Sequence, residues 1–321
     1  MKTTTRVLEL LSSTSTYLSG QQIADQLQLS RTAVWKAIKA LQDKGYAIKS
    51  KAHVGYCYVD DNTLNETLIK QNLNNSLDLD ILLYDSLPST NLKAKELSLD
   101  PTLKRPVVLI ADQQTAGYGR YQRSFLSPKK TGIYLSILLD NDQVDFDPGL
   151  LTTATAIAVT RTLEKLFPIT PSIKWVNDVL VDGKKICGIL TEGIADLETQ
   201  TLSQIVIGTG INFATPMTAF PPKLHQRIGS LAPYLAKTSV SRNQFIAEYL
   251  NQFFDIYQNY ATGNFMPEYR AHCELIGKQV TIEQGQKQFN AKVSDINDHG
   301  ALVLADGRIL SSGEITKIRK E

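Results

Sequence analysis

A glycine-rich loop with two arginines is the feature of this sequence that could most directly do chemistry. Gly117 and Gly119 follow an apolar run, Val107–Ile110, whose composition predicts a buried strand. Arg120 and Arg123 add permanent guanidinium charges to the loop. Because glycine tolerates a positive φ and a close approach to a ligand, the pattern favours a mobile lid that binds phosphate or carboxylate. A surface loop without a ligand is the alternative that this pattern leaves open.

Two later segments place polar residues beside apolar runs. Within Ile173–Glu192, apolar residues flank Asp182 and Gly183, and an Asp-Gly pair is a strong signal for a hairpin turn. Lys185 is therefore expected near the turn, at the start of the second strand of the hairpin. The segment Ile205–Phe213 has the pattern of a further strand.

Together, these three blocks resemble the catalytic domain of biotin protein ligases. The similarity also includes Ser89–Asn91 and Glu268–Val280, and it covers the chain from about Tyr84 to the C-terminus. Several co-linear motifs are far more specific than any one of them. The resemblance implies an α+β protein in which a class II aminoacyl-tRNA-synthetase-like ligase domain, a mixed sheet with flanking helices, precedes a C-terminal SH3-like β-barrel.

The first 60 residues have a basic character that the rest of the chain lacks. They carry an excess of four positive charges, whereas the whole chain has a net charge of +2, which favours a separate module for a polyanion. Ile23 and Leu27 lie at helical spacing, and a short turn follows them. Ser30 is expected to cap a helix over Arg31–Asp43 that ends at Gly45. This is the spacing of a helix-turn-helix.

A two-stranded wing is expected over Tyr46–Val59, directly after this helix. The whole segment resembles the winged helix-turn-helix of the bifunctional biotin ligases that also repress biotin genes. We expect the second helix to contact base edges with Arg31, Thr32 and Trp35. The side chains expected to contact phosphates are Lys36, Lys39, Lys49 and Lys51. A winged helix used only for protein contacts is the alternative.

The remaining pattern divides the chain into three predicted domains, residues 1–62, 63–272 and 273–321. Thr63 is expected to cap a short helix after the polar hinge Asp60–Asn62. Longer helices are predicted over Leu151–Phe167 and from Ser241 to about Gly263. Strands are predicted over 81–84, 106–111, 132–139, 173–175, 179–181, 186–192, 204–213, 279–283, 289–295, 301–304 and 308–310.

The resemblance implies a two-step reaction with ATP and biotin as substrates and with Mg²⁺. The carboxylate of biotin attacks the α-phosphate of ATP, which gives biotinyl-5′-adenylate and pyrophosphate. A lysine amine of a carrier domain then displaces AMP. Because like charges repel strongly where water is excluded, the first step needs fixed cations. The resemblance assigns this catalytic role to Arg120 and Lys185.

The same resemblance supplies the other site residues. Those expected around biotin, together with the two catalytic residues, are Ser89, Thr90, Asn91, Gln114 and Tyr118. Those expected around ATP and the adenylate, together with Arg120, are Arg123, Phe125, Lys174, Asn177, Asn212, Phe220 and Arg227. Asp178 is expected either to orient Lys185 or to contact a hydrated Mg²⁺. For Ser89 and Thr90, capping of a following helix is the alternative.

The glycine-rich loop departs from the family pattern. Many members have Gly-Arg-Gly-Arg-Arg-Gly-Arg-Trp, whereas this chain has Tyr118, Tyr121, Gln122 and Phe125 at the second, fifth, sixth and aromatic positions. Tyr118 removes one cation that would serve biotin binding and the coupling of ligand to dimerisation. Phe125 retains an aromatic face that can pack in a lid.

The expected partners are biotin carboxyl carrier domains of acetyl-CoA carboxylase and other biotin-dependent carboxylases, operator DNA of biotin genes, and a second copy of this chain when biotinyl-adenylate is bound. The alternatives are a biotin-sensing transcription factor with weak or no ligase activity, and a lipoate or octanoyl transfer enzyme. Three widely spaced cysteines, with no signal-peptide or membrane-spanning pattern, favour reduced thiols in the cytoplasm.

Overall fold

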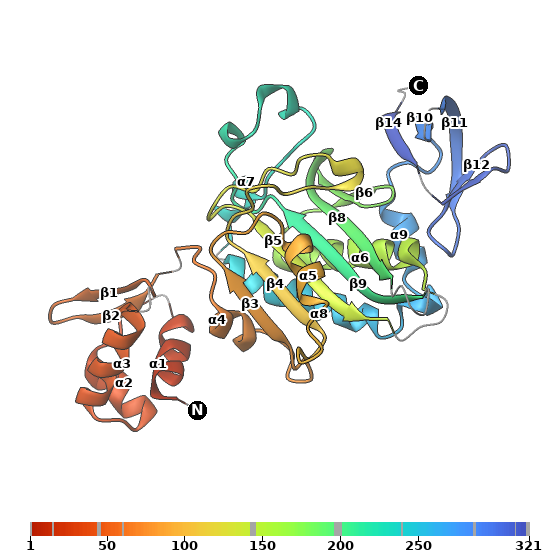
Figure 1. Cartoon of the computed structure of the whole chain (residues 1–321). Coiled ribbons are helices and arrows are strands. Elements are labelled where there is room, and N and C mark those ends of the chain that lie inside the picture. The colour runs from red at the N-terminus through yellow and green to blue at the C-terminus, as the bar shows by residue number, and fades with distance from the viewer. Residues whose placement is uncertain are drawn as a thin grey trace. The chain divides into compact units, whose positions relative to one another are not determined.

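The computed structural model describes residues 2–14, 16–43, 46–59, 61–141, 146–195, 201–238, 240–284, 287–311 and 313–318. Contacts divide the chain into two compact units, Met1–Asn72 with Ser241–Gln244, and Leu73–Val240 with Phe245–Glu321. Figure 1 shows the elements of each unit. None of the helices in these ranges is long and apolar enough to cross a membrane.

The first unit is a helix-turn-helix with a two-stranded wing, as predicted. Its helices and strands are α1 (Thr3–Ser12), α2 (Gly20–Leu27), α3 (Arg31–Asp43), β1 (Ile48–Lys51), β2 (Gly55–Tyr58) and α4 (Glu66–Gln71). The two strands are antiparallel. One buried cluster joins Leu8 of α1, Ile23 of α2, Ile38 of α3 and Leu68 of α4, so the apolar faces of the helices form a common core.

Side-chain caps determine where the helices of this unit begin. Ser19 and Gln22 form a reciprocal capping box at α2. At α3, the Ala33 N–H donates to Ser30 Oγ at 3.1 Å, which confirms the predicted cap. Gln28, with a φ of 53°, adopts the left-handed conformation that ends α2 and turns the chain toward α3.

Two details of this unit differ from the sequence predictions. Helix α1 is an additional element, with Val7, Leu8 and Leu11 buried. The predicted cap at Thr63 is wrong, because Asn65 directly precedes α4 and its side chain accepts from the Leu68 N–H at 3.1 Å. Gly45 and Asp60, the predicted helix end and the first residue of the predicted hinge, lie outside the described residues.

The core of the second unit is a seven-stranded mixed sheet. Its strands are β3 (Asp80–Tyr84), β4 (Val107–Ala111), β5 (Ile133–Asp140), β6 (Ser172–Lys174), β7 (Asp178–Val181), β8 (Lys184–Ala195) and β9 (Leu202–Ile211). They lie in the order β3-β4-β5-β9-β8-β7-β6. Strands β3 and β4 are parallel, and the other described neighbours are antiparallel. Each predicted strand is confirmed, with its ends shifted by a few residues.

Helices cover both faces of this sheet (Figure 1). The helices of this unit are α5 (Thr90–Leu97), α6 (Pro148–Leu166), α7 (Ala232–Leu235), α8 (Arg242–Tyr257) and α9 (Met266–His272), of which α5 covers one face and α6 and α8 cover the other (Figure 1). Ala94 of α5 and Val206 of β9 belong to one buried cluster, whereas Tyr249 of α8 lies with its hydroxyl 2.9 Å from Thr209 Oγ1. Because even and odd residues of a strand face opposite sides, α5 and α8 lie on opposite faces of the sheet.

Short 3₁₀ helices and a small second sheet complete this unit. The 3₁₀ helices are η1 (Arg120–Gln122), η2 (Met217–Ala219), η3 (Pro222–Leu224) and η4 (Tyr260–Thr262). The small sheet is five-stranded and contains β10 (Gln279–Gln284), β11 (Lys287–Ile296), β12 (Leu302–Leu304), β13 (Ile309–Leu310) and β14 (Glu314–Ile318). Strand β14 is an addition to the predicted elements. Trp175 Nε1 donates to the Gly300 carbonyl at 2.8 Å, which connects the turn after β6 to this sheet.

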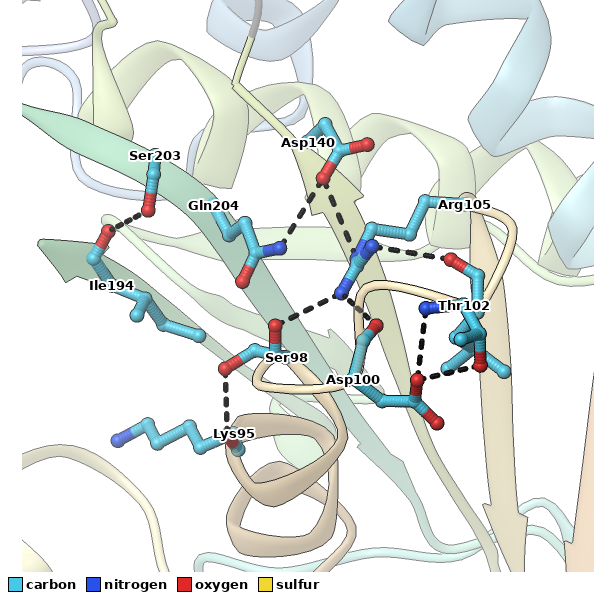
Figure 2. A network of polar contacts seen from close by, with 10 residues as sticks. Lys95, Ser98, Asp100, Thr102, Arg105, Asp140, Ile194, Ser203 and Gln204 are labelled. Atoms are coloured by element: carbon cyan, nitrogen blue, oxygen red, sulfur yellow. Dashed lines mark hydrogen bonds and ion pairs between the residues drawn. The ribbon is translucent and has the colours of Figure 1, made fainter. Parts of the chain in front are cut away.

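A nearly buried arginine forms hydrogen bonds with the loop that connects α5 to β4, as Figure 2 shows. The Arg105 side chain is only 9% exposed. Its Nη2 donates to the carbonyls of Ser98 at 2.9 Å and Asp100 at 3.0 Å, and its Nη1 donates to the Leu103 carbonyl at 3.1 Å. Its Nε lies 3.4 Å from Asp140 Oδ1 on β5. The turn that follows α5 is therefore organised around one guanidinium.

Replacing Arg105 with alanine should destabilise the second unit, because three backbone carbonyls lose a donor together. At about 0.5–1.5 kcal/mol for each hydrogen bond lost at these half-buried carbonyls, we expect the free energy of unfolding to fall by about 2–4 kcal/mol in urea titrations. Lys104→Ala is the matched control, since Lys104 forms an exposed ion pair with Asp78 and should leave the midpoint unchanged. Equal midpoints for Arg105→Ala and the unmodified chain would contradict this role.

Candidate functional site

Glycines on two neighbouring strands form the floor of the candidate site. Gly188 of β8 lies opposite Gly210 of β9, and Gly208 follows on the same face. A Cβ on Gly208 would lie 2.2 Å from Asn91 Oδ1, and a Cβ on Gly210 would lie 2.6 Å from the ring of Phe125. The missing side chains therefore leave room for groups from α5 and from the glycine-rich loop to approach the sheet.

A cavity of about 510 Å³ lies over these glycines, a size usual for small-molecule sites. Its walls are the start of α5, the glycine-rich loop, the ends of β6 to β8, and the segment 224–228. Most of the predicted small-molecule residues lie together around it: Ser89, Thr90, Asn91, Gln114, Tyr118, Arg120, Arg123, Phe125, Lys174, Asn177, Asp178, Lys185 and Arg227.

Lys185 reaches over the floor because of a β-bulge. The register between β7 and β8 shifts at Ile186, which is left without an opposite residue. The bulge turns Lys185 to the same face as Gly188, and a Cβ on Gly188 would lie 3.0 Å from Lys185 Nζ. The ammonium lies 2.6 Å from Asp178 Oδ1, so this carboxylate orients the lysine over the cavity.

Arg120, which also lines the cavity, is held by contacts with Gly313, Asn177 and Tyr121. Its Nη2 donates to the Gly313 carbonyl at 2.9 Å, and its Nη1 lies 3.4 Å from Asn177 Oδ1. Its guanidinium also lies 5.3 Å from the centre of the Tyr121 ring, within reach of a cation–π interaction. The described contacts of Arg120 are thus with neutral groups, which leaves its positive charge for a ligand.

The glycine-rich loop forms a small hairpin closed by its own backbone. The Phe125 N–H donates to the Gly117 carbonyl and the Gly119 N–H to the Arg123 carbonyl, both at 2.8 Å. A Cβ on Gly117 would lie 2.6 Å from the Phe125 carbonyl, so close approach requires this glycine. The positive φ values of the loop lie at its tip, at Tyr121 and Gln122, so close approach is the one of the two expected glycine roles that Gly117 fulfils.

Neutral hydrogen-bonding groups line the α5 end of the cavity. Gln114 Oε1 accepts from the Thr90 N–H at 2.8 Å and from Thr90 Oγ1 at 3.1 Å, and Gln114 Nε2 donates to Ser127 Oγ at 2.9 Å. Ser136 Oγ donates to Asn91 Oδ1 at 2.6 Å. Ser89 accepts from the Leu92 N–H at 3.5 Å, so it caps α5, as the alternative states, and also lines the cavity.

Two predicted residues lie behind the wall. The segment 224–229 pairs with the start of β8, since the Lys185 N–H donates to the Arg227 carbonyl at 2.9 Å. Asn212 Nδ2 donates to the Gly229 carbonyl at 2.9 Å and so holds this segment. Phe220 is 4% exposed. Neither Asn212 nor Phe220 is among the lining residues, because a sequence motif fixes a position but not the direction of its side chain.

The cavity also contains residues that the sequence analysis does not single out, among them Trp175, Glu274 and Ile315. Burial raises the pKa of Glu274, the charge of Lys174 opposes this shift, and the charge of Asp178 adds to it. Glu274 lies within the block 268–280 that resembles the ligases, so the sequence showed that it belongs to a family motif. Its position near Lys174 depends on the packing of α9 near β6, which motif spacing does not reveal.

All residues predicted to contact DNA are exposed in the first unit: Arg31, Thr32, Trp35, Lys36, Lys39, Lys49 and Lys51. Trp35 is 57% exposed, although Val34 and Ile38 on the same helix are buried. Lys39 lies 3.3 Å from Asp43 in an exposed pair. The outer face of α3 therefore presents one large aromatic among cations, a composition suited to the edge of a nucleic-acid groove.

Known proteins share this arrangement. Residues 83–212 match the biotin/lipoate A/B protein ligase family, residues 3–57 match a helix-turn-helix (HTH) domain, and residues 275–317 match the biotin protein ligase C terminal domain. The structure of a biotin protein ligase from Aquifex aeolicus, in complex with biotin and ATP, is similar with a TM-score of 0.58 at 21% identity, over 75% of this chain and 99% of that one. This similarity shows a common fold.

Sequence relatives define the family more closely. The bifunctional ligase/repressor BirA of Bacillus subtilis is 33% identical over 312 residues, which is 95% of each chain. The biotin–[acetyl-CoA-carboxylase] ligase of Mycobacterium tuberculosis is 30% identical over 223 residues, which is 66% of this chain and 79% of that protein. Fold and site thus define a protein ligase joined to a DNA-binding module. The chain belongs to the biotin/lipoate protein ligase family, among its bifunctional ligase/repressors.

Proposed function

We propose that this protein activates biotin with ATP, transfers it to a lysine of a biotin carrier domain, and represses biotin genes when it holds the adenylate. The observation that carries the ligase role is the cavity in which Lys185 and Arg120 face a floor of glycines, beside an end with neutral polar groups. The chain's bifunctional relatives support both roles. The protein substrates are carboxyl carrier domains of acetyl-CoA carboxylase and other biotin-dependent carboxylases.

In the first step, an oxygen of the biotin carboxylate forms a bond to the α-phosphorus of ATP, and the bond from that phosphorus to the bridging oxygen breaks. Pyrophosphate leaves with the electron pair. Lys185 and Arg120 bracket the carboxylate and the α-phosphate, and they stabilise the charge that develops between them. Lys174, Arg123 and Arg227 supply further positive charge for the phosphates.

In the second step, the carrier lysine attacks the acyl carbon of biotinyl-5′-AMP. The bond from this carbon to the phosphate oxygen breaks, AMP leaves, and the new amide loses a proton. The lysine must reach the cavity as a neutral amine, since an ammonium has no electron pair to donate. The ureido ring of biotin occupies the end with Ser89, Thr90, Asn91 and Gln114, where donors and acceptors lie among apolar groups.

Magnesium enters this scheme with the triphosphate of ATP. The described residues hold no group of three His, Cys, Asp or Glu side chains that could bind a metal by themselves. Asp178 and Glu274 both line the cavity, and Mg²⁺ typically uses one or two carboxylates together with phosphate oxygens and water. The residues therefore fit a metal brought by ATP, and Asp178, which forms an ion pair with Lys185, would be the carboxylate that contacts it.

Pyrophosphate exchange tests the ligase role directly. Labelled pyrophosphate should enter ATP when the protein is given biotin, and the exchange should not occur with lipoate or octanoate. Exchange with lipoate alone would select the acyl transfer alternative. Exchange with neither would leave a biotin-sensing repressor with weak or no ligase activity.

Lys185→Ala should slow adenylate formation by about 100- to 1,000-fold in single turnover, the usual effect of losing one electrostatic stabiliser. Biotin binding without ATP should change less, because the charge develops only during the reaction. Lys184→Ala is the control, since Lys184 is the exposed neighbour on the same strand and lies outside the cavity lining. A rate near that of the unmodified chain would remove Lys185 from the mechanism.

We propose that residues 1–62 form the DNA-binding domain, that residues 63–272 form the ligase domain, and that residues 273–321 form the C-terminal domain. One winged helix contacts one half-site, so repression of a palindromic operator requires two copies of this chain. We propose that biotinyl-adenylate promotes this homodimer. The adenylate then has two fates, transfer to a carrier lysine or retention in a repressor dimer.

Trp35→Ala should reduce discrimination between operator and random DNA, whereas Lys49→Ala should weaken binding to both and lower the salt slope by about one unit. Lys70→Ala, in an exposed pair with Glu66, is the charge-matched control. Gel-shift titrations across a range of salt, with and without biotinyl-adenylate, measure these effects. An affinity that the adenylate leaves unchanged would refute the coupled repressor while leaving the ligase intact.

A further inference from the structure

The side chain of Glu192 joins two walls of the cavity. It lies on the same face of β8 as Gly188, because alternate residues of a strand share a face. Glu192 Oε1 accepts from Lys95 Nζ at 2.6 Å, and Oε2 accepts from Asn91 Nδ2 at 2.7 Å. The Tyr118 hydroxyl donates to the same Oε2 at 2.9 Å. One carboxylate therefore connects α5 to the glycine-rich loop.

Helix α5 offers this carboxylate a fixed set of donors. At its start, Ser136 of β5 donates to Asn91 Oδ1 at 2.6 Å. At its end, Arg105 donates to the Ser98 carbonyl, and the Ser98 hydroxyl donates to the Lys95 carbonyl (Figure 2). The helix is thus tied to the sheet on both sides of the Glu192 contacts.

The ionisation states suit a permanent contact. Burial acts to raise the pKa of Glu192, but hydrogen bonds from Lys95, Asn91 and Tyr118 outweigh it, and the pKa falls below its usual value. Burial, and then the charge of Glu192, raise the pKa of Tyr118 well above its usual value. Around neutral pH the carboxylate is therefore ionised and the phenol protonated, which is the combination that gives a strong hydrogen bond.

We propose that Glu192 is a positioning residue that anchors the glycine-rich loop to α5 through the Tyr118 hydroxyl, and that this contact sets the affinity for biotin rather than the rate of its activation. Biotin lies between α5 and the loop in the proposed function, on which this inference rests. Glu192 is not among the residues that line the cavity. It acts by holding Asn91 and Tyr118, which do line it, in register with each other.

Trypsin cleavage of the ligand-free protein measures how firmly the loop is anchored. The loop contains cleavage sites after Arg120 and Arg123, and local opening must precede cutting. Tyr118→Phe removes only the donor hydroxyl, and Glu192→Gln removes the charge of the acceptor. We expect each to speed cleavage at these sites about tenfold, with an effect of the double variant that is clearly less than additive, because both changes act on the same hydrogen bond.

Glu96→Gln is the matched control. Glu96 lies on the same helix and forms an exposed pair with Lys93, so this variant should be cleaved like the unmodified chain. Calorimetry should give a dissociation constant for biotin about tenfold weaker in Tyr118→Phe and in Glu192→Gln. In Glu192→Gln, whose side chain does not line the cavity, the kcat of pyrophosphate exchange at saturating biotin should stay within about twofold, which a general loss of structure would not allow.

Unchanged cleavage and unchanged biotin affinity in Tyr118→Phe would overturn the proposal, and so would additive effects in the double variant. Thermal melting identifies a variant that has lost its fold. If Glu192→Gln does not fold, Tyr118→Phe decides the question, because it removes one hydroxyl only. An unmodified chain that binds no biotin would refute the proposed function instead, and the cleavage comparison would still test the anchor.

Discussion

The approach of one anion to another is the constraint on which the rest of this structure depends. A carboxylate and a triphosphate repel each other, and the repulsion grows as water is excluded from a cavity. Cations from separate parts of the chain line the cavity and can offset this repulsion. They are Arg120 and Arg123 from the loop, Lys174 from β6, Lys185 from β8, and Arg227 from the segment that pairs with β8. The sheet positions these charges around one cavity, because its strands carry Lys174 and Lys185.

Cations so close together need compensation when the cavity is empty. Asp178 supplies it for Lys185 through their ion pair, and Arg120 instead rests on the carbonyl of Gly313 and the ring of Tyr121. The floor of the cavity must instead be free of side chains, because a ligand must approach the strands closely. Gly188, Gly208 and Gly210 meet it by having no side chain on the face below the loop and α5.

Much of this could be predicted from the sequence, because local signals determine it. Ser30 marks the start of the recognition helix, and the Asp182-Gly183 pair marks the hairpin that carries Lys185. The bulge at Ile186 could not be predicted, since a register shift depends on how two strands pair. The contacts of Glu192 with α5 and the loop could not be predicted from the sequence either, because they join residues from three distant segments.

The details that the sequence left undetermined share a physical cause. Thr63 and Asn65 are both acceptable caps, and only the backbone path decides between them. Asn212 belongs to a recognisable motif, but its amide holds the Gly229 carbonyl behind the wall. The positive φ values fell on Tyr121 and Gln122 rather than on the glycines, because the backbone bonds of the hairpin fix its tip there.

Calorimetric titration of the full-length protein with biotin and with its neutral primary amide tests the central claim most directly. The two ligands share the ureido ring and differ in the charge that the cations are proposed to receive. If fixed cations drive the encounter, biotin should bind at least about tenfold more tightly than the amide, and the difference should shrink as salt screens the charges. Equal affinities at every salt concentration would contradict the claim that these cations hold the carboxylate.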